Sequence, residues 1–130
     1  MHLDERVRGM LDSRSFAVLA TLNADGSPQT SVIWVGRDGD VVLFTTHSKR
    51  RKTRNLQRDP RASLTVFAAD DPYQTANIHG TVELVPDPDR RLSIELTHRY
   101  LGEEPPEDPP GSERFIGRLT PERVSGYARS

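Results

Sequence analysis

The chain has 130 residues, of which 34% are hydrophobic and 28% charged, and its formal net charge at pH 7 is −1. That length suits one domain around one core, so we expect residues 1–130 to form a single unit. The lack of cysteine excludes disulfides and thiolate chemistry. The N-terminus has no apolar signal segment and no apolar run approaches the roughly 18 residues of a membrane span, so we expect a soluble, cytoplasmic protein without a membrane partner.

Helical spacing of apolar residues predicts a short amphipathic helix over residues 4–13. Three aliphatic runs follow, at residues 15–22, 29–35 and 41–46, and each predicts a strand. The segment 36–40 contains two glycines and is expected to be a turn. The short connections predict an antiparallel meander, because parallel neighbours need a crossover of about a dozen residues or more.

The next segment, residues 52–58, contains good helix formers and predicts a second short helix. Strands are predicted at residues 62–68 and 75–85, with a polar loop at 69–74 between them. Gly80 lies inside the second of these strands. A glycine there indicates a bulge or a close approach of another backbone.

A third helix is predicted over residues 89–101, with Asp89 as its N-cap. Residues 102–112 are rich in proline and acid and indicate a mobile or extended loop. One or two strands around Thr120-Pro121 close the chain. About six strands with two or three short helices predict a mainly β fold, a small antiparallel barrel with peripheral helices.

The basic stretch Thr45–Pro60 directly follows the third predicted strand. Lys49 to Arg61 contains seven bases and one acid, a charge of +6, so the other residues carry −7. Such a local patch is either a solvated turn or a place that holds an anion. A nucleic-acid binder would show spread basicity and interleaved aromatic residues, so we expect no nucleic-acid partner.

The chain lacks a P-loop, a nucleophile elbow and a His-Glu-x-x-His pair, so we expect no catalytic side chain and no metal site. Its four histidines, His2, His47, His79 and His98, have no metal-ligand spacing. Histidines of this kind are more often locally hydrogen-bonded than ligands. We therefore expect the chemistry to come from a bound cofactor.

A phosphorylated cofactor would fit the loop after the third strand. A hydroxyl from Thr45 or Thr46, the guanidinium of Arg50 and the ammonium of Lys52 are donors that suit a phosphate. The start of the following helix adds free backbone N–H groups. The aromatic part of the cofactor is expected along the second strand, where the edge of a polar ring can be hydrogen-bonded by Gln29, Thr30, Ser31 and the backbone around Val32 and Ile33.

Three blocks carry a resemblance to a known superfamily: Gly26-x-Pro28-Gln29-x-Ser31, Arg50-x-Lys52-Thr-Arg-Asn55-Leu, and Asn77-x-x-Gly80-Thr-x-Glu. Across them the chain resembles the pyridoxamine-phosphate-oxidase-like, FMN-binding split β-barrel proteins, and among these the deazaflavin (coenzyme F420) dependent reductases. The resemblance implies a six-stranded antiparallel split β-barrel. It also implies a homodimer whose active sites lie in grooves between the subunits.

The resemblance assigns further roles by position. Gln29 and Ser31 match residues beside the deazaflavin ring, and Asn55 matches a residue that ties the helix start to the loop. Tyr73 falls where an aromatic side chain of the partner subunit approaches the cofactor, although an ordinary exposed tyrosine is an equal alternative. His79 is a further candidate for cofactor contact.

Two hypotheses about function remain. The first is an oxidoreductase that transfers hydride from reduced coenzyme F420 to a small conjugated organic acceptor. FMN is the alternative cofactor, because it presents the same ribityl phosphate, but Lys49, Arg51 and Arg54 favour F420 because they could meet its polyglutamate tail. The chain lacks the longer C-terminal segment of true pyridoxamine phosphate oxidases, which argues against that reaction. The second hypothesis is a flavin-, haem- or deazaflavin-binding protein without turnover.

Overall fold

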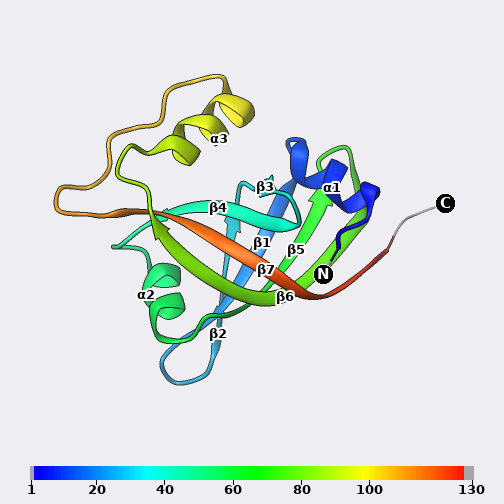
Figure 1. Cartoon of the computed structure of the whole chain (residues 1–130), viewed down its shortest axis with the longest axis horizontal. Coiled ribbons are helices and arrows are strands. Elements are labelled where there is room, and N and C mark those ends of the chain that lie inside the picture. Colours follow the sequence, from blue (N-terminus) through cyan, green and yellow to red (C-terminus); the bar gives the residue numbers. More distant parts are fainter. Residues whose placement is uncertain (1, 128–130) are drawn as a thin grey trace.

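The computed structural model describes residues 2–127 and contains three helices and seven strands (Figure 1). Among these residues, none of the helices has the length and apolar character needed to cross a membrane. The helices are α1 (Glu5–Asp12), α2 (Arg51–Arg58) and α3 (Arg91–Leu101). The strands are β1 (Phe16–Leu22), β2 (Pro28–Ile33), β3 (Gly36–Asp38), β4 (Val41–His47), β5 (Arg61–Ala68), β6 (Asp71–Pro86) and β7 (Arg114–Tyr127).

All seven strands form one antiparallel sheet in the order β2-β1-β5-β6-β7-β4-β3. The two edge strands, β2 and β3, are separated only by Trp34 and Val35. One bent stretch of chain therefore provides both edges, and the sheet must curl to bring them near each other, although β2 and β3 do not pair. The mainly β split barrel predicted from the sequence is confirmed, with seven strands in place of six.

The predicted meander is confirmed for β1 and β2, which pair antiparallel, but it is wrong for the third predicted strand, β4. β4 pairs with β3 and β7 and not with β2, because the chain continues through Trp34 and Val35 into β3 at the far edge of the sheet and β4 turns back on β3. The segment 36–40, expected to be a turn, contains β3 and a tight turn at Gly39, whose φ of 61° is in the left-handed region. A three-residue strand is too short for an alternation pattern to reveal.

Other boundaries also differ from the sequence prediction. β6 begins at Asp71, so most of the expected loop 69–74 is strand, and the C-terminal strands are one strand, β7. The cap of α3 is not Asp89. The carboxylate of Asp87 accepts from the backbone N–H groups of Arg91 and Leu92, each at 3.1 Å. Residues 102–113 contain no helix or strand, as predicted.

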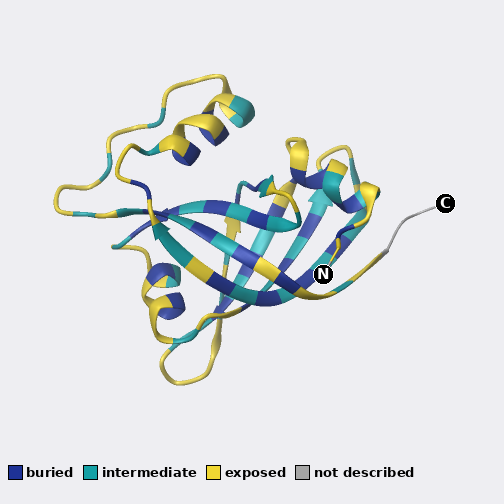
Figure 2. Cartoon of the chain, in the orientation of Figure 1, coloured by how far each residue is buried: buried dark blue, intermediate teal, exposed yellow. Residues whose placement is uncertain are grey.

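The helices close the barrel and cover part of its outside. Val7, Met10 and Leu11 of α1 belong to the same buried cluster as Leu56 of α2, so both helices pack onto the core (Figure 2). α3 packs on the outer side of β3 and β4. An added Cβ at Gly36 would lie 3.5 Å from Leu96 there. On the outer face of β1 and β2, Phe16 and Val32 are 40% and 68% exposed.

Two glycines allow close approaches within the sheet. The register shifts between His79 and Gly80, and a Cβ on Gly80 would lie 2.0 Å from the carbonyl oxygen of Thr120. The sequence prediction of a bulge or a close backbone approach at Gly80 is confirmed. At Gly117 of β7 an added Cβ would lie 2.2 Å from the ring of Phe44, which is fully buried on the neighbouring β4. The β4–β7 ladder therefore needs glycine at position 117.

We predict that Gly117→Ala lowers the free energy of unfolding by about 1–3 kcal/mol, the usual cost of overpacking a core. Urea denaturation measures it. In a Phe44→Leu background the same change should cost less, because the ring that blocks the methyl group is gone. Gly9→Ala, on α1 with nothing within 4 Å of the added Cβ, is the matched control and should not destabilise. Equal costs of Gly117→Ala in both backgrounds would contradict the packing argument.

Candidate functional site

A cavity of about 280 Å³ opens where the end of β4 and the start of α2 meet β1 and β2. Apolar side chains form one side of it and cationic side chains the other. The cavity brings together five of the predicted site residues, Val32, Thr45, Thr46, Arg50 and Lys52. Phe16, Ile33, Trp34, His47 and Arg114 complete its lining.

Strand alternation separates the two threonines. Thr46 points inward and is buried, and its hydroxyl lies 2.9 Å from the hydroxyl of Thr53. Thr53 in turn donates to the carbonyl of His47 at 2.7 Å, which fixes the turn between β4 and α2. Thr45 is half-buried on the other side of β4. Of the two predicted alternatives, Thr45 has the hydroxyl that is better placed for a ligand.

The cationic side of the cavity carries an unfavourable concentration of charge. Lys52 is half-buried, and burial followed by the neighbouring Arg50 lowers its pKa to about 8. Arg50 itself is exposed and directs its Nε toward His47. Arg50 is the N-cap residue of α2, and its side chain makes no capping hydrogen bond within residues 2–127. An anion placed here would relieve the repulsion between the two cations.

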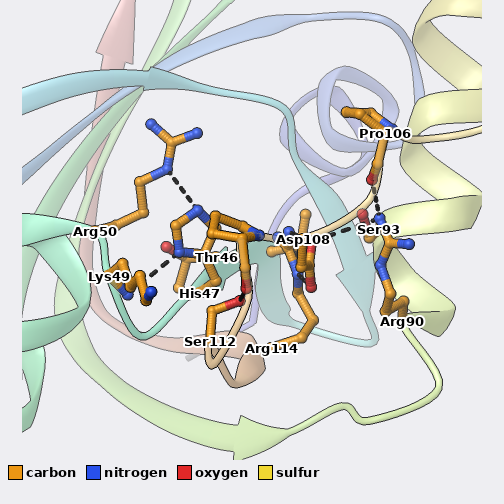
Figure 3. Close-up of polar contacts among 12 residues, drawn as sticks. Thr46, His47, Lys49, Arg50, Arg90, Ser93, Pro106, Asp108, Ser112 and Arg114 are labelled. Carbon is orange, nitrogen blue, oxygen red and sulfur yellow. Dashed lines mark hydrogen bonds and ion pairs between the residues drawn. The ribbon is translucent and has the colours of Figure 1, made fainter.

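Arg114 is a functional candidate that the sequence did not reveal. It is the first residue of β7, and β4–β7 pairing places it opposite His47. Its Nη1 donates to the hydroxyl of Thr45 at 3.3 Å, while its Nε donates to Asp108 at 3.0 Å. This hydrogen bond and the charge of Arg114 hold the pKa of Asp108 below its ordinary value. Arg90 lies 3.5 Å from the same carboxylate, so Asp108 joins two arginines (Figure 3).

The proline-rich loop 102–113 is tied to the basic turn by several bonds. Lys49 Nζ donates to the carbonyl of Pro110 at 2.6 Å. Ser48 and Glu113 exchange two bonds, from Ser48 N to the Glu113 carbonyl at 2.8 Å and from Glu113 N to the Ser48 hydroxyl at 2.9 Å. A second cavity of about 410 Å³ lies under this loop. It shares with the first cavity the residues Trp34, Thr45, His47, Arg50 and Arg114.

Asn55 and Gln29 support the site from behind. Asn55 is buried and its Nδ2 lies 3.1 Å from the hydroxyl of Thr21 and 3.0 Å from Asn23 Oδ1. Thr21 in turn donates to Gln29 Oε1 at 3.3 Å. This chain of hydrogen bonds ties α2 to β1 and β2. Neither Asn55 nor Gln29 lines the cavity, so both stabilise the elements around it and do not face its interior.

The remaining predicted residues lie in different places. Ser31 points inward from β2, and its hydroxyl is buried without a hydrogen-bond partner within residues 2–127. Thr30 and His79 line cavities on the outer face of the sheet, where Ser63 Oγ and His79 Nδ1 are 2.8 Å apart. Tyr73 is exposed near the start of β6 and lines neither cavity. Their roles stay predictions.

Trp34, which lines both cavities, belongs to an aromatic pair. The ring of Trp34 stacks on that of Tyr100 at 5.0 Å with an angle of 13° between the planes. The hydroxyl of Tyr100 donates to the Ser15 carbonyl at 2.6 Å, so the pair joins α3 to the start of β1. Trp34 is thereby held in one orientation beside the cationic side chains.

A family model described as pyridoxamine 5′-phosphate oxidase matches residues 3–128. The chain belongs to the pyridoxamine 5′-phosphate oxidase family. Pyridoxine/pyridoxamine 5′-phosphate oxidases of Methylibium petroleiphilum and Bordetella pertussis are 35% and 34% identical to it, over 65% and 63% of this chain. The chain spans 40% and 39% of the length of these curated relatives.

Solved structures agree with the sequence match. An F420 reductase is 33% identical, with a TM-score of 0.81 over 95% of this chain and 98% of its own. A conserved hypothetical protein from Mycobacterium tuberculosis, 24% identical, has a TM-score of 0.75 over 95% of this chain and 83% of its own and shares the fold. The predicted membership of the split β-barrel superfamily and its F420 reductase branch is confirmed.

In this member of the pyridoxamine 5′-phosphate oxidase family, lysine occurs only at positions 49 and 52. We predict that Lys52 titrates with a pKa of about 8, which ¹³C-lysine NMR measures, with Lys49→Arg to assign the two signals. Arg50→Ala should raise the pKa of Lys52, because it removes a neighbouring positive charge.

The lowered pKa of Lys52 also determines the sign of its contribution to the pH dependence of the free energy of unfolding. The pKa of Lys52 is lower in the folded chain than in the unfolded chain, so the unfolded state binds more protons between about 8 and the ordinary value of 10.5. The contribution of Lys52 to the free energy of unfolding therefore rises with pH across that range. Titration of Lys52 at the ordinary lysine value of 10.5 would contradict the account.

Proposed function

We propose that the chain is a cofactor-dependent oxidoreductase that binds coenzyme F420 and transfers hydride to a small conjugated organic acceptor. The observation that carries the proposal is the cavity in which Thr45, Arg50 and Lys52 converge beside an apolar wall. The similarity to an F420 reductase over nearly the full length of both chains supports the choice of cofactor.

The cationic side of the cavity fits the phosphate of such a cofactor. Arg50 offers a planar fork of donors, Lys52 a point charge and Thr45 a hydroxyl that Arg114 orients. The pKa of Lys52 is lowered to about 8 mainly by burial, which a bound anion would counteract. The uncapped start of α2 adds its backbone N–H groups and the positive end of its dipole.

The apolar side fits an aromatic ring. Phe16, Val32 and Trp34 offer apolar and aromatic surface, and β2 pairs with β1 on one side only. Backbone groups on the free edge of β2 are therefore available to the polar edge of a ring. The buried hydroxyl of Ser31, on the same strand, has hydrogen-bonding capacity that the described residues do not use.

In this mechanism the protein binds and orients. A reduced deazaflavin would supply the hydride, and the side chains need form no covalent bond with the substrate. Arg50, Lys52 and Thr45 would hold the phosphate, and β2 with its apolar neighbours would hold the ring. The walls of the cavity would limit access of water to the ring.

FMN is the second candidate, because curated relatives are named pyridoxine/pyridoxamine 5′-phosphate oxidases and a ribityl phosphate suits the same donors. A protein that binds the cofactor without turnover is the remaining alternative. It would bind F420 or FMN but reduce no acceptor in a panel of quinones, enones and tetrapyrroles.

A homodimer is part of the proposal. Phe16 and Val32 line the cavity and are also exposed on the outer face of β1 and β2, so a second copy on that face would complete the cavity wall. We predict a dimer in sedimentation velocity and a monomer for Val18→Lys, which places a charge on that face. Ile94→Lys, on the exposed side of α3, should stay dimeric. A monomeric wild-type protein would contradict the proposal.

The cofactor assignment is tested by titrating the purified apo-protein with F420 and FMN. We predict that Arg50→Ala and Lys52→Ala each weaken binding about tenfold or more, because a hydrogen bond between charged groups contributes about 1.5–3 kcal/mol. Arg54→Ala is the charge-matched control on the exposed side of α2 and should leave FMN affinity unchanged. A loss of F420 affinity alone in Arg54→Ala would place the tail near α2. Absence of binding of both cofactors would overturn the proposal.

A further inference from the structure

His47, the last residue of β4, has an N–H donor directed at each of its ring nitrogens (Figure 3). The backbone N of Lys49 lies 3.2 Å from Nδ1, and Nε of Arg50 lies 3.2 Å from Nε2. A neutral imidazole has one N–H and one nitrogen that accepts, and an imidazolium has two N–H groups. Only one of the two contacts can therefore be a hydrogen bond at any time.

The two donors differ in their freedom to move. Lys49 N belongs to a turn that is held by the bonds from Ser48 N to the Glu113 carbonyl and from Arg50 N to the His47 carbonyl. The guanidinium of Arg50 ends an exposed, flexible side chain. The bond from Lys49 N is therefore the one that persists, and it leaves the ring proton on Nε2. That N–H lies on the Arg50 side of the ring, and His47 lines the cavity.

We propose that His47 is a further ligand of the bound phosphate, to which it donates through Nε2–H. The Arg50 side chain then turns away from His47 and binds the same anion, so that its Nε–H no longer faces the Nε2–H of His47. Lys49 acts through its backbone, because its N–H fixes the tautomer. The inference rests on the proposed function, since it takes the phosphate cavity as its site.

The groups that face His47 support a neutral donor near pH 7. They are Lys49 and Arg50 of its own turn, Arg114 of β7 and Asp108 of the proline-rich loop. Burial and then Arg50 lower the pKa of His47, and Asp108 opposes them. A bound anion favours the protonated ring, so binding raises this pKa. Anion affinity should therefore rise as pH falls through the range between the free and bound values.

Two substitutions separate the ring nitrogens. In His47→Asn the side-chain oxygen can still accept from Lys49 N, but the donor at the Nε2 position is lost. In His47→Gln the amide nitrogen reaches the Nε2 position and restores a donor. We expect affinity for F420, and for FMN in parallel, to fall about tenfold in His47→Asn and to recover most of that loss in His47→Gln. His2→Asn, at an exposed histidine, is the control.

The pH dependence gives a readout that a purely structural role would not move. The cofactor phosphate titrates in the same way with both proteins, so its effect cancels in the ratio of wild-type to His47→Asn affinity. That ratio should grow as the pH falls below 7. Wild-type protein labelled with ¹⁵N-histidine needs no variant. Its spectrum should show His47 protonated at Nε2 and not at Nδ1, with the Nε2 signal shifting when F420 or FMN is added.

The outcomes distinguish failure of the proposed function from failure of the proposed role of His47. Wild-type protein that binds neither cofactor, or whose binding is indifferent to Arg50→Ala, overturns the proposed function. Binding that depends on Arg50 but is equal in wild-type protein and His47→Asn overturns the role of His47 alone. So does a spectrum in which Nδ1 carries the proton.

Discussion

The rest of the site depends on two positive charges, Arg50 and Lys52, that the fold holds close together at the start of α2. Arg50 and Lys52 face one cavity, and burial with the neighbouring guanidinium lowers the pKa of Lys52 to about 8. Hydrogen bonds beneath them keep the turn in place: the Thr53 hydroxyl donates to the His47 carbonyl and accepts from the Thr46 hydroxyl. A phosphate in the cavity would turn a repulsive arrangement into an attractive one.

The curvature of the sheet determines which side chains lie opposite Arg50 and Lys52. Because β2 and β3 are one bent stretch, the sheet curls and brings Val32 and Trp34 to the cavity that Thr45 lines from β4. The ring of Phe44 packs over Gly117 across the β4–β7 ladder, and the same ladder places Arg114 beside Thr45. The site therefore has an ionic end and an apolar end, which suits a phosphorylated cofactor with an aromatic ring.

Local signals predicted the parts of this site that lie within one segment. The strand before the basic stretch, the short helix after it and the pattern Arg50-x-Lys52 all follow from residues close in sequence, and the bulge at Gly80 follows from one glycine in an apolar run. Arg114 could not be found in this way, because it is 69 residues from Thr45 and reaches it only through β4–β7 pairing. Asp108 could not be found in this way either, because its acidic, proline-rich surroundings are typical of a solvated loop. In the structure it pairs with two arginines.

The most direct test of the central claim is an assigned ¹H–¹⁵N NMR spectrum of the wild-type protein during titration with F420, and with FMN in parallel. The account predicts that the largest changes occur in the amides of residues 45–52 and of β2, since the phosphate and the ring lie there. A spectrum in which a cofactor binds but residues 45–52 do not respond would contradict it.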